Sequence, residues 1–362
     1  MSEVRKKAKI ALEDGRVFEG LSFGADGERY GEVVFNTSMS GYQEILTDPS
    51  YKGQIVLMTY PLIGNYGVNK NDAESARMFV EGFIVKENSS IASNWASEGG
   101  LGDYLRSNGI IGLEDIDTRA LTKHIRVKGA MKAVISTVES DNATLVKKAS
   151  DSEGLVGRDL VREVTSSREY DWNTEGKYKV AVIDCGVKFN ILRHLAARGC
   201  RQRVFPADVD HKTILDWAPD GIFLSNGPGD PEAVTYVYAT VAKLLGKKPI
   251  FGICLGQQIL GLALGGRTFK LKFGHHGGNQ PVKELSTGKV SITSQNHGFC
   301  VDLDSVKGKG VEVTHVNLND QTLEGMKSDK LNFTSVQFHP EAGPGPNDAT
   351  YLFDRFIDKM KR

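Results

Sequence analysis

Residues 249–260 read PIFGICLGQQIL, an apolar strand-like run that passes directly into a helix-like one. The turn between them, residues 252–256, is a G-x-C-x-G sequence. A sharp strand-to-helix turn strains its central residue, so the flanking positions must be small. Such a turn lifts the central side chain out of the carboxyl end of the strand, where open α/β sheets bind ligands. The sequence therefore predicts a nucleophile elbow with Cys254 at its tip.

Cys254 has the local surroundings expected of a nucleophile. The N-terminus of the following helix would favour the thiolate form of the sulfur, and the Leu255 backbone N–H is available to an oxyanion. The motif alone leaves a second interpretation open, because a small buried cysteine in a glycine-rich turn has the same sequence.

A base for this cysteine is available at Phe338-His339-Pro340-Glu341, which ends the apolar run Phe333 to Phe338. Residues two apart in an extended segment face the same side, so Glu341 is placed to orient the His339 imidazole. A lone histidine is more often structural. The paired carboxylate and the elbow upstream favour a Cys-His-Glu triad here.

A third piece is the loop Ser225-Asn226-Gly227-Pro228-Gly229-Asp230-Pro231, directly after the apolar run GIFL. Two glycines at a strand end let backbone N–H groups approach a substrate closely, so the loop is a candidate second oxyanion donor. An ordinary tight turn is the alternative, since the loop is rich in turn-forming residues.

The regions around these motifs indicate the fold. From residue 179 onward, short apolar strands alternate with helices of about ten residues, the pattern of a parallel sheet covered on both faces. Residues 1–150 are strand-rich with two helical segments, which predicts an α+β domain. The polar, weakly periodic residues 151–178 are predicted to be a linker, and residues 179–362 an α/β domain with a mostly parallel central sheet.

Composition excludes several classes of protein. The chain has 362 residues, and 45 Lys+Arg against 45 Asp+Glu give a formal net charge of zero, which argues against a nucleic-acid binder. No apolar run approaches the roughly 20 residues of a membrane span, and the N-terminus lacks the apolar core of a signal peptide. Four scattered cysteines suit a reducing compartment. A cytoplasmic protein of two domains is expected.

The other histidines and cysteines are assigned less chemistry. His275 and His276 are adjacent, so their side chains diverge and a metal pair is not expected. His297 lies in a polar segment where it could recognise substrate, Cys185 and Cys200 are expected in the core, and no role is assigned to Cys300. The sequence has neither a P-loop nor a dinucleotide-binding glycine motif, so no metal and no cofactor is predicted on this chain.

Taken together, SNGPGDP, FGICLGQQ and QFHPEA resemble the class I (triad-type) glutamine amidotransferases over about residues 179–362. GHHGGNQPV (274–282), SQNHGFCVD (294–302) and HPEAGPGPNDA (339–349) resemble, more narrowly, the small-subunit family of carbamoyl-phosphate synthetases. VFNTSMSGYQEILTDPSYKGQIV (34–56) and EDIDTRALT (114–122) are similar to the N-terminal domain of that family. One departure is Gln257, where some relatives carry histidine.

This resemblance implies a glutaminase. Cys254 would attack the side-chain amide of L-glutamine, His339 would transfer protons, and Glu341 would orient His339, with hydrolysis through a γ-glutamyl thioester. It also implies a set of glutamine-binding residues, in which Gly227 and Leu255 present the oxyanion N–H groups: Ser50, Gly227, Gly229, Leu255, Gln258, Asn296, Gly298 and Phe299.

The resemblance further implies a large-subunit partner in a heterodimer. Ammonia would pass to that subunit, which uses ATP and Mg with bicarbonate to make carbamoyl phosphate for pyrimidine and arginine biosynthesis. Three alternatives are a glutamine amidotransferase serving a different acceptor synthase, a partnerless cysteine hydrolase such as a γ-glutamyl peptidase, and a non-catalytic regulatory subunit. The last would be expected to lack Cys254, His339 or Glu341, which are all present.

Overall fold

The structure, a computed structural model, describes residues 6–361. The chain forms two compact units. The first comprises the residues up to Leu155 together with Lys272–His276, and the second comprises Val156–Leu271 and the residues from Gly277 onward. The chain therefore passes from one unit to the other three times, and neither unit is a single continuous segment.

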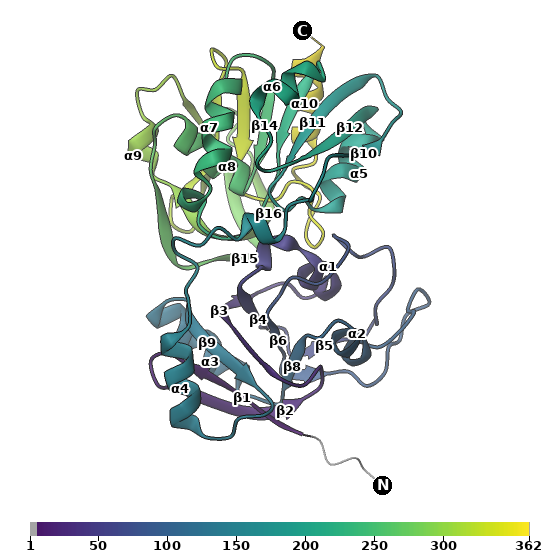
Figure 1. The fold of residues 1–362 in the computed structure, drawn as a ribbon, viewed down its shortest axis with the longest axis vertical. Coiled ribbons are helices and arrows are strands. Elements are labelled where there is room, and N and C mark those ends of the chain that lie inside the picture. Colours follow the sequence, from purple (N-terminus) through teal and green to yellow (C-terminus); the bar gives the residue numbers. More distant parts are fainter. Residues whose placement is uncertain (1–5, 362) are drawn as a thin grey trace. The chain divides into compact units, whose positions relative to one another are not determined.

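The first unit is built around a closed barrel with the strand order β1-β2-β8-β6-β4-β3-β9 (Figure 1). Its elements are β1 (Lys7–Leu12), β2 (Val17–Ser22), β3 (Glu28–Asn36), α1 (Tyr42–Thr47), η1 (Pro49–Tyr51), β4 (Gln54–Met58), β5 (Leu62–Ile63), β6 (Gly82–Ile84), β7 (Glu87–Asn88), α2 (Leu101–Ser107), β8 (Ile111–Glu114), α3 (Thr118–Lys128), β9 (Met131–Ser136) and α4 (Asn142–Asp151).

Local sequence explains why several of these elements begin and end where they do. β1 and β2 form an antiparallel hairpin around the turn residues Glu13-Asp14-Gly15. The Asp117 carboxylate accepts a hydrogen bond from the Ala120 N–H at the start of α3, and Gly129, with φ 109°, follows its last residue. The closed barrel could not be predicted from the sequence, because closure depends on pairs of strands, such as β1 and β9, that are far apart in the chain.

The second unit is an α/β domain. Its elements are η2 (Val161–Glu163), β10 (Tyr170–Asn173), β11 (Tyr178–Asp184), α5 (Phe189–Ala197), β12 (Cys200–Pro206), α6 (His211–Asp216), β13 (Gly221–Leu224), η3 (Pro231–Ala233), α7 (Thr235–Leu244), β14 (Ile250–Ile253), α8 (Leu255–Ala263), β15 (Thr268–Glu284), β16 (Val290–Val301), α9 (Leu303–Val306), β17 (Glu312–Asn317), β18 (Leu323–Ser328), β19 (Phe333–Val336) and α10 (Tyr351–Met360). The central part of β15, Lys272–His276, belongs to the first unit.

The sheet of this unit has ten strands in the order β10-β12-β11-β13-β14-β19-β18-β17-β15-β16. The strands from β12 to β19 in this order pair in parallel, as predicted. Beyond them, β10 pairs antiparallel with β12, and β18, β17 and β15 continue antiparallel on the other side. The parallel strands thus form the centre of a mixed sheet, and β14, which leads to the elbow, lies within that centre.

Alternate residues of the parallel strands fill two separate cores. Ala181 and Ile183 of β11 pack with residues of α6, α7 and α8. Val180 and Val182 of the same strand pack with residues of α5 and α10. Since successive side chains of a strand point to opposite faces, a strand covered by helices on both sides must be apolar throughout. This explains the uninterrupted apolar run VAVI in the sequence.

Two features differ from the sequence-based expectation. Residues 156–178, within the predicted linker 151–178, belong to the second unit, and β10 lies in its sheet. Their weak periodicity concealed this, because they are held by backbone hydrogen bonds, by pairing with β12 and by a few scattered apolar side chains such as Val161 and Trp172. In addition, β16 runs from Val290 to Val301, a length that the sequence pattern does not predict, because the later residues of the strand are polar and do not alternate with apolar ones.

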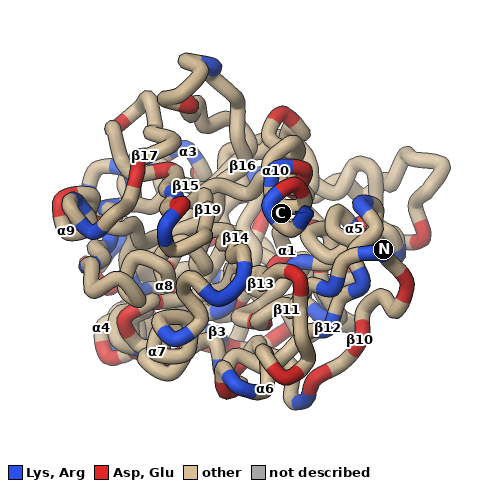
Figure 2. The backbone as a smooth tube through the Cα atoms, turned by 90° about the horizontal axis from the view of Figure 1, so that it is seen from above, with Lys and Arg blue, Asp and Glu red and all other residues tan. Residues whose placement is uncertain are grey.

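Charged residues of both signs are spread along the backbone of the described chain, without a long run of one sign (Figure 2). Among residues 6–361, no helix is long and apolar enough to cross a membrane.

Candidate active site

Cys254 lies at the tip of the predicted elbow, between β14 and α8. Its backbone has φ 55° and ψ −107°, a conformation that side-chain-bearing residues seldom adopt. Its N–H donates to the Val336 carbonyl of β19 at 2.9 Å, which fixes the turn to the neighbouring strand. Strain held by surrounding structure in this way is typical of functional positions.

The two glycines of the elbow allow close packing. A Cβ at Gly256 would lie 2.4 Å from the Leu224 carbonyl oxygen of β13, and a Cβ at Gly252 would lie 2.9 Å from the Gly256 backbone. Helix α8 therefore approaches the sheet more closely than any residue with a side chain would permit. This is the steric reason for the G-x-C-x-G spacing.

His339 and Glu341 lie together as predicted. His339 Nδ1 is 2.7 Å from Glu341 Oε1, and both side chains are buried. The His339 N–H donates to the Ser294 carbonyl at 2.8 Å, so β16 fixes the histidine backbone. With Nδ1 occupied by the carboxylate, Nε2 is the nitrogen left to exchange a proton with a nucleophile.

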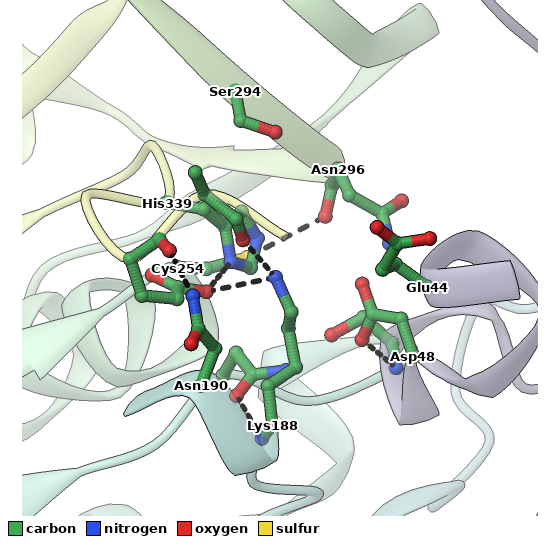
Figure 3. A network of polar contacts seen from close by, with 12 residues as sticks. Glu44, Asp48, Lys188, Asn190, Cys254, Ser294, Asn296 and His339 are labelled. Atoms are coloured by element: carbon green, nitrogen blue, oxygen red, sulfur yellow. Dashed lines mark hydrogen bonds and ion pairs between the residues drawn. The ribbon is translucent and has the colours of Figure 1, made fainter. Parts of the chain in front are cut away.

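The cysteine sulfur adjoins both the histidine and β16. Cys254 Sγ donates to the Asn296 carbonyl at 3.5 Å, and the sulfur is close enough to His339 to influence its charge (Figure 3). Cys254, from the turn between β14 and α8, and His339 and Glu341, from the segment after β19, therefore form one buried cluster in the second unit.

Lys188 is the residue that sequence analysis missed. Its ammonium lies 3.1 Å from Glu341 Oε1 and also donates to the Ala342 carbonyl, and its side chain is 3% exposed. Asn190 donates to the Glu341 carbonyl, so the start of α5 holds the segment that carries the acid (Figure 3). The sequence could have indicated Lys188 only by its position, because it follows the carboxyl end of β11, where α/β sheets place functional groups.

These contacts set the charges of the site. Burial opposes ionisation of Glu341, but the Lys188 ammonium and His339 hold the pKa of its carboxyl below the usual range. Burial likewise opposes charge on His339, but Glu341 and the neighbouring Cys254 raise the pKa of the imidazole above its usual value. A protonated His339 between a carboxylate and a cysteine sulfur is the state that this arrangement favours.

The candidate oxyanion residues lie against each other. A Cβ at Gly227 would come within 2.2 Å of the Cys185 carbonyl oxygen and 2.7 Å of the Leu255 side chain. Gly229, with φ 83°, packs beside Leu160. The loop after β13 is thus adjacent to the first residue of α8. Its backbone comes so close that only glycine fits at position 227.

The residues predicted to bind glutamine are distributed over both units. Asn296 and Phe299 lie on β16. The Phe299 carbonyl accepts from Gln258 at 2.8 Å, and the Asn296 carbonyl accepts from the Cys254 sulfur. A Cβ at Gly298 would meet no atom within 4 Å, so this position has room beside it. Ser50 lies in η1 of the first unit, where its N–H donates to Asp48, and its contact with glutamine stays a prediction.

His276 and the other three cysteines lie in structural surroundings. His276 belongs to the first unit, where its carbonyl accepts from the Thr37 N–H and its ring lies 6.1 Å from that of Tyr51. Cys185 and Cys200 are buried in the two cores as expected, and burial raises the pKa of both thiols. Cys300 is buried too, and burial together with Glu324 raises its pKa. None of these three thiols has the surroundings of a nucleophile.

Comparison with known proteins identifies the family of both halves of the chain. Residues 10–135 match the family described as carbamoyl-phosphate synthase small chain, CPSase domain, and residues 181–359 match glutamine amidotransferase class-I. The carbamoyl phosphate synthase small chain of Syntrophotalea carbinolica is 56% identical over 371 residues and that of Aquifex aeolicus 55% over 368. The alignments cover 98% of this chain in both cases, with 98% and 99% of the relatives. The small chain of Archaeoglobus fulgidus is 50% identical, over 98% of this chain and 99% of its own. With matches of this extent on both halves, the chain belongs to the family of carbamoyl phosphate synthase small chains.

Proposed function

We propose that this chain is the glutaminase subunit of a carbamoyl phosphate synthase and that Cys254, His339 and Glu341 carry out the hydrolysis of L-glutamine. The observation that supports this most strongly is the strained elbow, which holds Cys254 beside a histidine whose other nitrogen is 2.7 Å from a buried carboxylate. This is the arrangement that activates a cysteine for attack on an amide.

In the proposed mechanism the Cys254 thiolate attacks the side-chain carbonyl carbon of glutamine. The backbone N–H groups of Gly227 and Leu255 stabilise the negative charge on the carbonyl oxygen. His339, protonated through its pairing with Glu341, gives its proton to the departing nitrogen as the C–N bond breaks, and ammonia leaves. A water molecule deprotonated by His339 then hydrolyses the γ-glutamyl thioester. Glutamate departs, and the cysteine is regenerated.

We propose that Gly229, Gln258, Asn296, Gly298, Phe299 and Ser50 bind the glutamine. We further propose that ammonia passes to a large subunit, in a heterodimer located in the cytoplasm. Under this proposal ATP and Mg are used on the large subunit with bicarbonate, and the small subunit needs no cofactor of its own. The resemblance of the N-terminal half to small chains of this family favours bicarbonate chemistry over a different acceptor synthase.

The test is a reconstituted assay. The chain is mixed with a cognate large subunit, glutamine, bicarbonate and Mg-ATP, and glutamate and carbamoyl phosphate are measured together. Equal amounts of the two products are expected. The matched control is Cys254→Ser, which should abolish glutamine-dependent synthesis and leave ammonia-dependent synthesis intact, because only the nucleophile is lost.

Two results would contradict the proposal at different points. Glutamine-dependent synthesis that survives Cys254→Ser would exclude Cys254 as the nucleophile. Glutamate formed without carbamoyl phosphate, by a complex that still works with free ammonia, would indicate a glutaminase that serves a different acceptor.

A further inference from the structure

A chain of buried polar side chains lies behind the nucleophile in the second unit. Glu324 on β18 is fully buried, and its Oε1 accepts from Gln295 Nε2 and from Asn317 Nδ2, each at 2.9 Å. On β16, Gln295 Oε1 lies 2.8 Å from His297 Nε2, and His297 Nδ1 lies 2.8 Å from the Phe299 carbonyl oxygen. Residues 295, 297 and 299 share one side of the strand, which allows this connected path.

Glu324 determines which way the Gln295 amide points. A carboxylate only accepts hydrogen bonds, so the NH₂ group of Gln295 must face Glu324. The amide oxygen is then turned toward His297. With the amide reversed, the Gln295 amide oxygen would face Glu324 Oε1 with no hydrogen between them. Two buried acceptors would then lack a hydrogen bond to each other, which is unfavourable.

His297 therefore faces an acceptor at both ring nitrogens. A backbone carbonyl oxygen and an amide oxygen each require a donor, and a neutral imidazole supplies only one N–H. Both contacts are satisfied only when the ring carries two protons and a positive charge. The Glu324 carboxylate, one amide group away, supplies a negative charge nearby, and its influence already contributes to the raised pKa of Cys300 on the same strand.

The path ends at groups of the proposed glutamine site. The Phe299 carbonyl that faces His297 also accepts from Gln258 Nε2 at 2.8 Å, and Gln258 lies one turn after Cys254 on α8. Asn296, between Gln295 and His297, presents its carbonyl to the Cys254 sulfur. Residues 295–299 are thereby held against both the nucleophile and its helix.

We propose that Glu324 is a positioning residue for glutamine binding: through Gln295 it keeps His297 doubly protonated, and His297 holds the strand segment 295–299 in the conformation that receives glutamine. This assignment rests on the proposed glutaminase function, but the charge of His297 is independent of turnover. Glu324 itself touches no reacting atom and acts through its neighbours.

The first measurement is an NMR spectrum that correlates each ring nitrogen with its bonded proton, recorded on protein labelled with ¹⁵N-histidine. The signals of His297 are identified as those that disappear in His297→Asn. At neutral pH, wild type is expected to show a bonded proton on both ring nitrogens of His297. In Glu324→Gln the new amide can donate as well as accept, so it no longer forces the NH₂ group of Gln295 away from His297. The Gln295 NH₂ can then face His297 Nε2, and one of the two ring protons is expected to be lost.

The second measurement is steady-state glutamine hydrolysis by the complex with the large subunit. Glu324→Gln is expected to raise KM for glutamine by about tenfold with little change in kcat, the effect of weakening one well-placed polar contact. The control is Glu312→Gln on β17, whose side chain is 61% exposed and pairs with Lys327, and KM should not change.

Two results overturn the proposal. One is a wild-type His297 with one unprotonated ring nitrogen at neutral pH, which needs no variant to fold. The other is Glu324→Gln with an unchanged KM. If the wild-type complex hydrolyses no glutamine at all, the proposed function fails, while the spectrum still decides whether Glu324 controls the charge of His297.

Discussion

The Lys188 ammonium and the Glu341 carboxylate form an ion pair that is almost completely removed from solvent, with side-chain exposures of 3% and 0%. Buried charges are tolerated only when each is paired and hydrogen-bonded. Lys188 meets this condition by contacting Oε1 of Glu341, the same carboxylate oxygen that faces His339 Nδ1. At the scale of single residues, the site therefore consists of Lys188 together with the three residues Cys254, His339 and Glu341.

Lys188→Met is expected to destabilise the second unit by about 3–5 kcal/mol, because it leaves a buried carboxylate with one partner fewer. It should also abolish most glutamine hydrolysis, since Glu341 loses a contact that fixes its position. Urea unfolding and glutaminase assays measure the two effects. In the control, Lys307→Met, an exposed pair with Asp304 is removed, and the loss should be about 1 kcal/mol or less.

The raised pKa of His339 predicts a pH dependence of stability. Above about pH 6.5 an unfolded histidine loses its proton, whereas the folded His339 keeps it. The unfolded state then binds fewer protons, so the free energy of unfolding should fall as pH rises, by up to about 1.4 kcal/mol per pH unit until the folded histidine titrates. The difference between wild type and His339→Asn, measured by urea unfolding from pH 6 to pH 9, isolates this contribution. A difference that is flat or rises over this range would contradict the assigned charge.

At the scale of elements, the contact between α8 and the sheet depends on glycine. Gly256→Ala would place a methyl group 2.4 Å from the Leu224 carbonyl oxygen, so α8 must move. Overpacking of this kind typically costs about 1–3 kcal/mol, and the shift also displaces Leu255, so activity should fall with stability. Gly154→Ala, at a position where a Cβ would meet only the Lys132 side chain at 3.9 Å, is the control and should change the free energy of unfolding by about 0.5 kcal/mol or less. An active, fully stable Gly256→Ala protein would show that this close approach is unnecessary.

The elements that could be predicted from the sequence are those with strong local signals. The parallel strands could be predicted because burial on both faces makes them continuously apolar. Helix α3 could be predicted because the residues that begin and end it, Asp117 and Gly129, are next to it in the sequence. Strands β15 and β16 have no comparable local signal, because many of their residues are polar or glycine, and pairing with neighbouring strands defines them instead of periodicity. In the site, Cys254, His339 and Glu341 were predictable from spacing. Lys188 was not, because its partner lies more than a hundred residues away in the chain.

At the scale of the whole molecule, the first unit is completed by residues from the middle of β15. Phe273 stacks on Phe35 of β3 with ring centroids 5.7 Å apart, and the Lys272 carbonyl accepts from the Ala130 N–H. A fragment ending near residue 155 would lack these contacts. The continuous domain of residues 1–150 expected from the sequence therefore omits part of its own packing.

Phe273→Ala is accordingly expected to destabilise the first unit by about 2 kcal/mol, less than the roughly 3–5 kcal/mol for a fully buried aromatic side chain, because Phe273 is only partly buried. Phe269→Ala on the same strand is the matched control, since Phe269 is 43% exposed and belongs to the second unit. Hydrogen exchange of the barrel strands distinguishes the two, because only Phe273→Ala should accelerate exchange there. Equal protection of the barrel in both variants would contradict the assignment of this segment.

The pairing of β14 with β19 has a consequence for the order in which the protein becomes active. Ile250 of β14 pairs with Phe333 of β19, and the Cys254 N–H donates to the Val336 carbonyl. The strand that leads to the nucleophile therefore has no neighbour on this side until β19 has been synthesised. His339 and Glu341 come later still. Parallel pairs between distant segments form slowly, and a chain is synthesised from its N-terminus. The elbow of a growing chain therefore has neither its supporting strand nor its base until the residues as far as Glu341 have been synthesised.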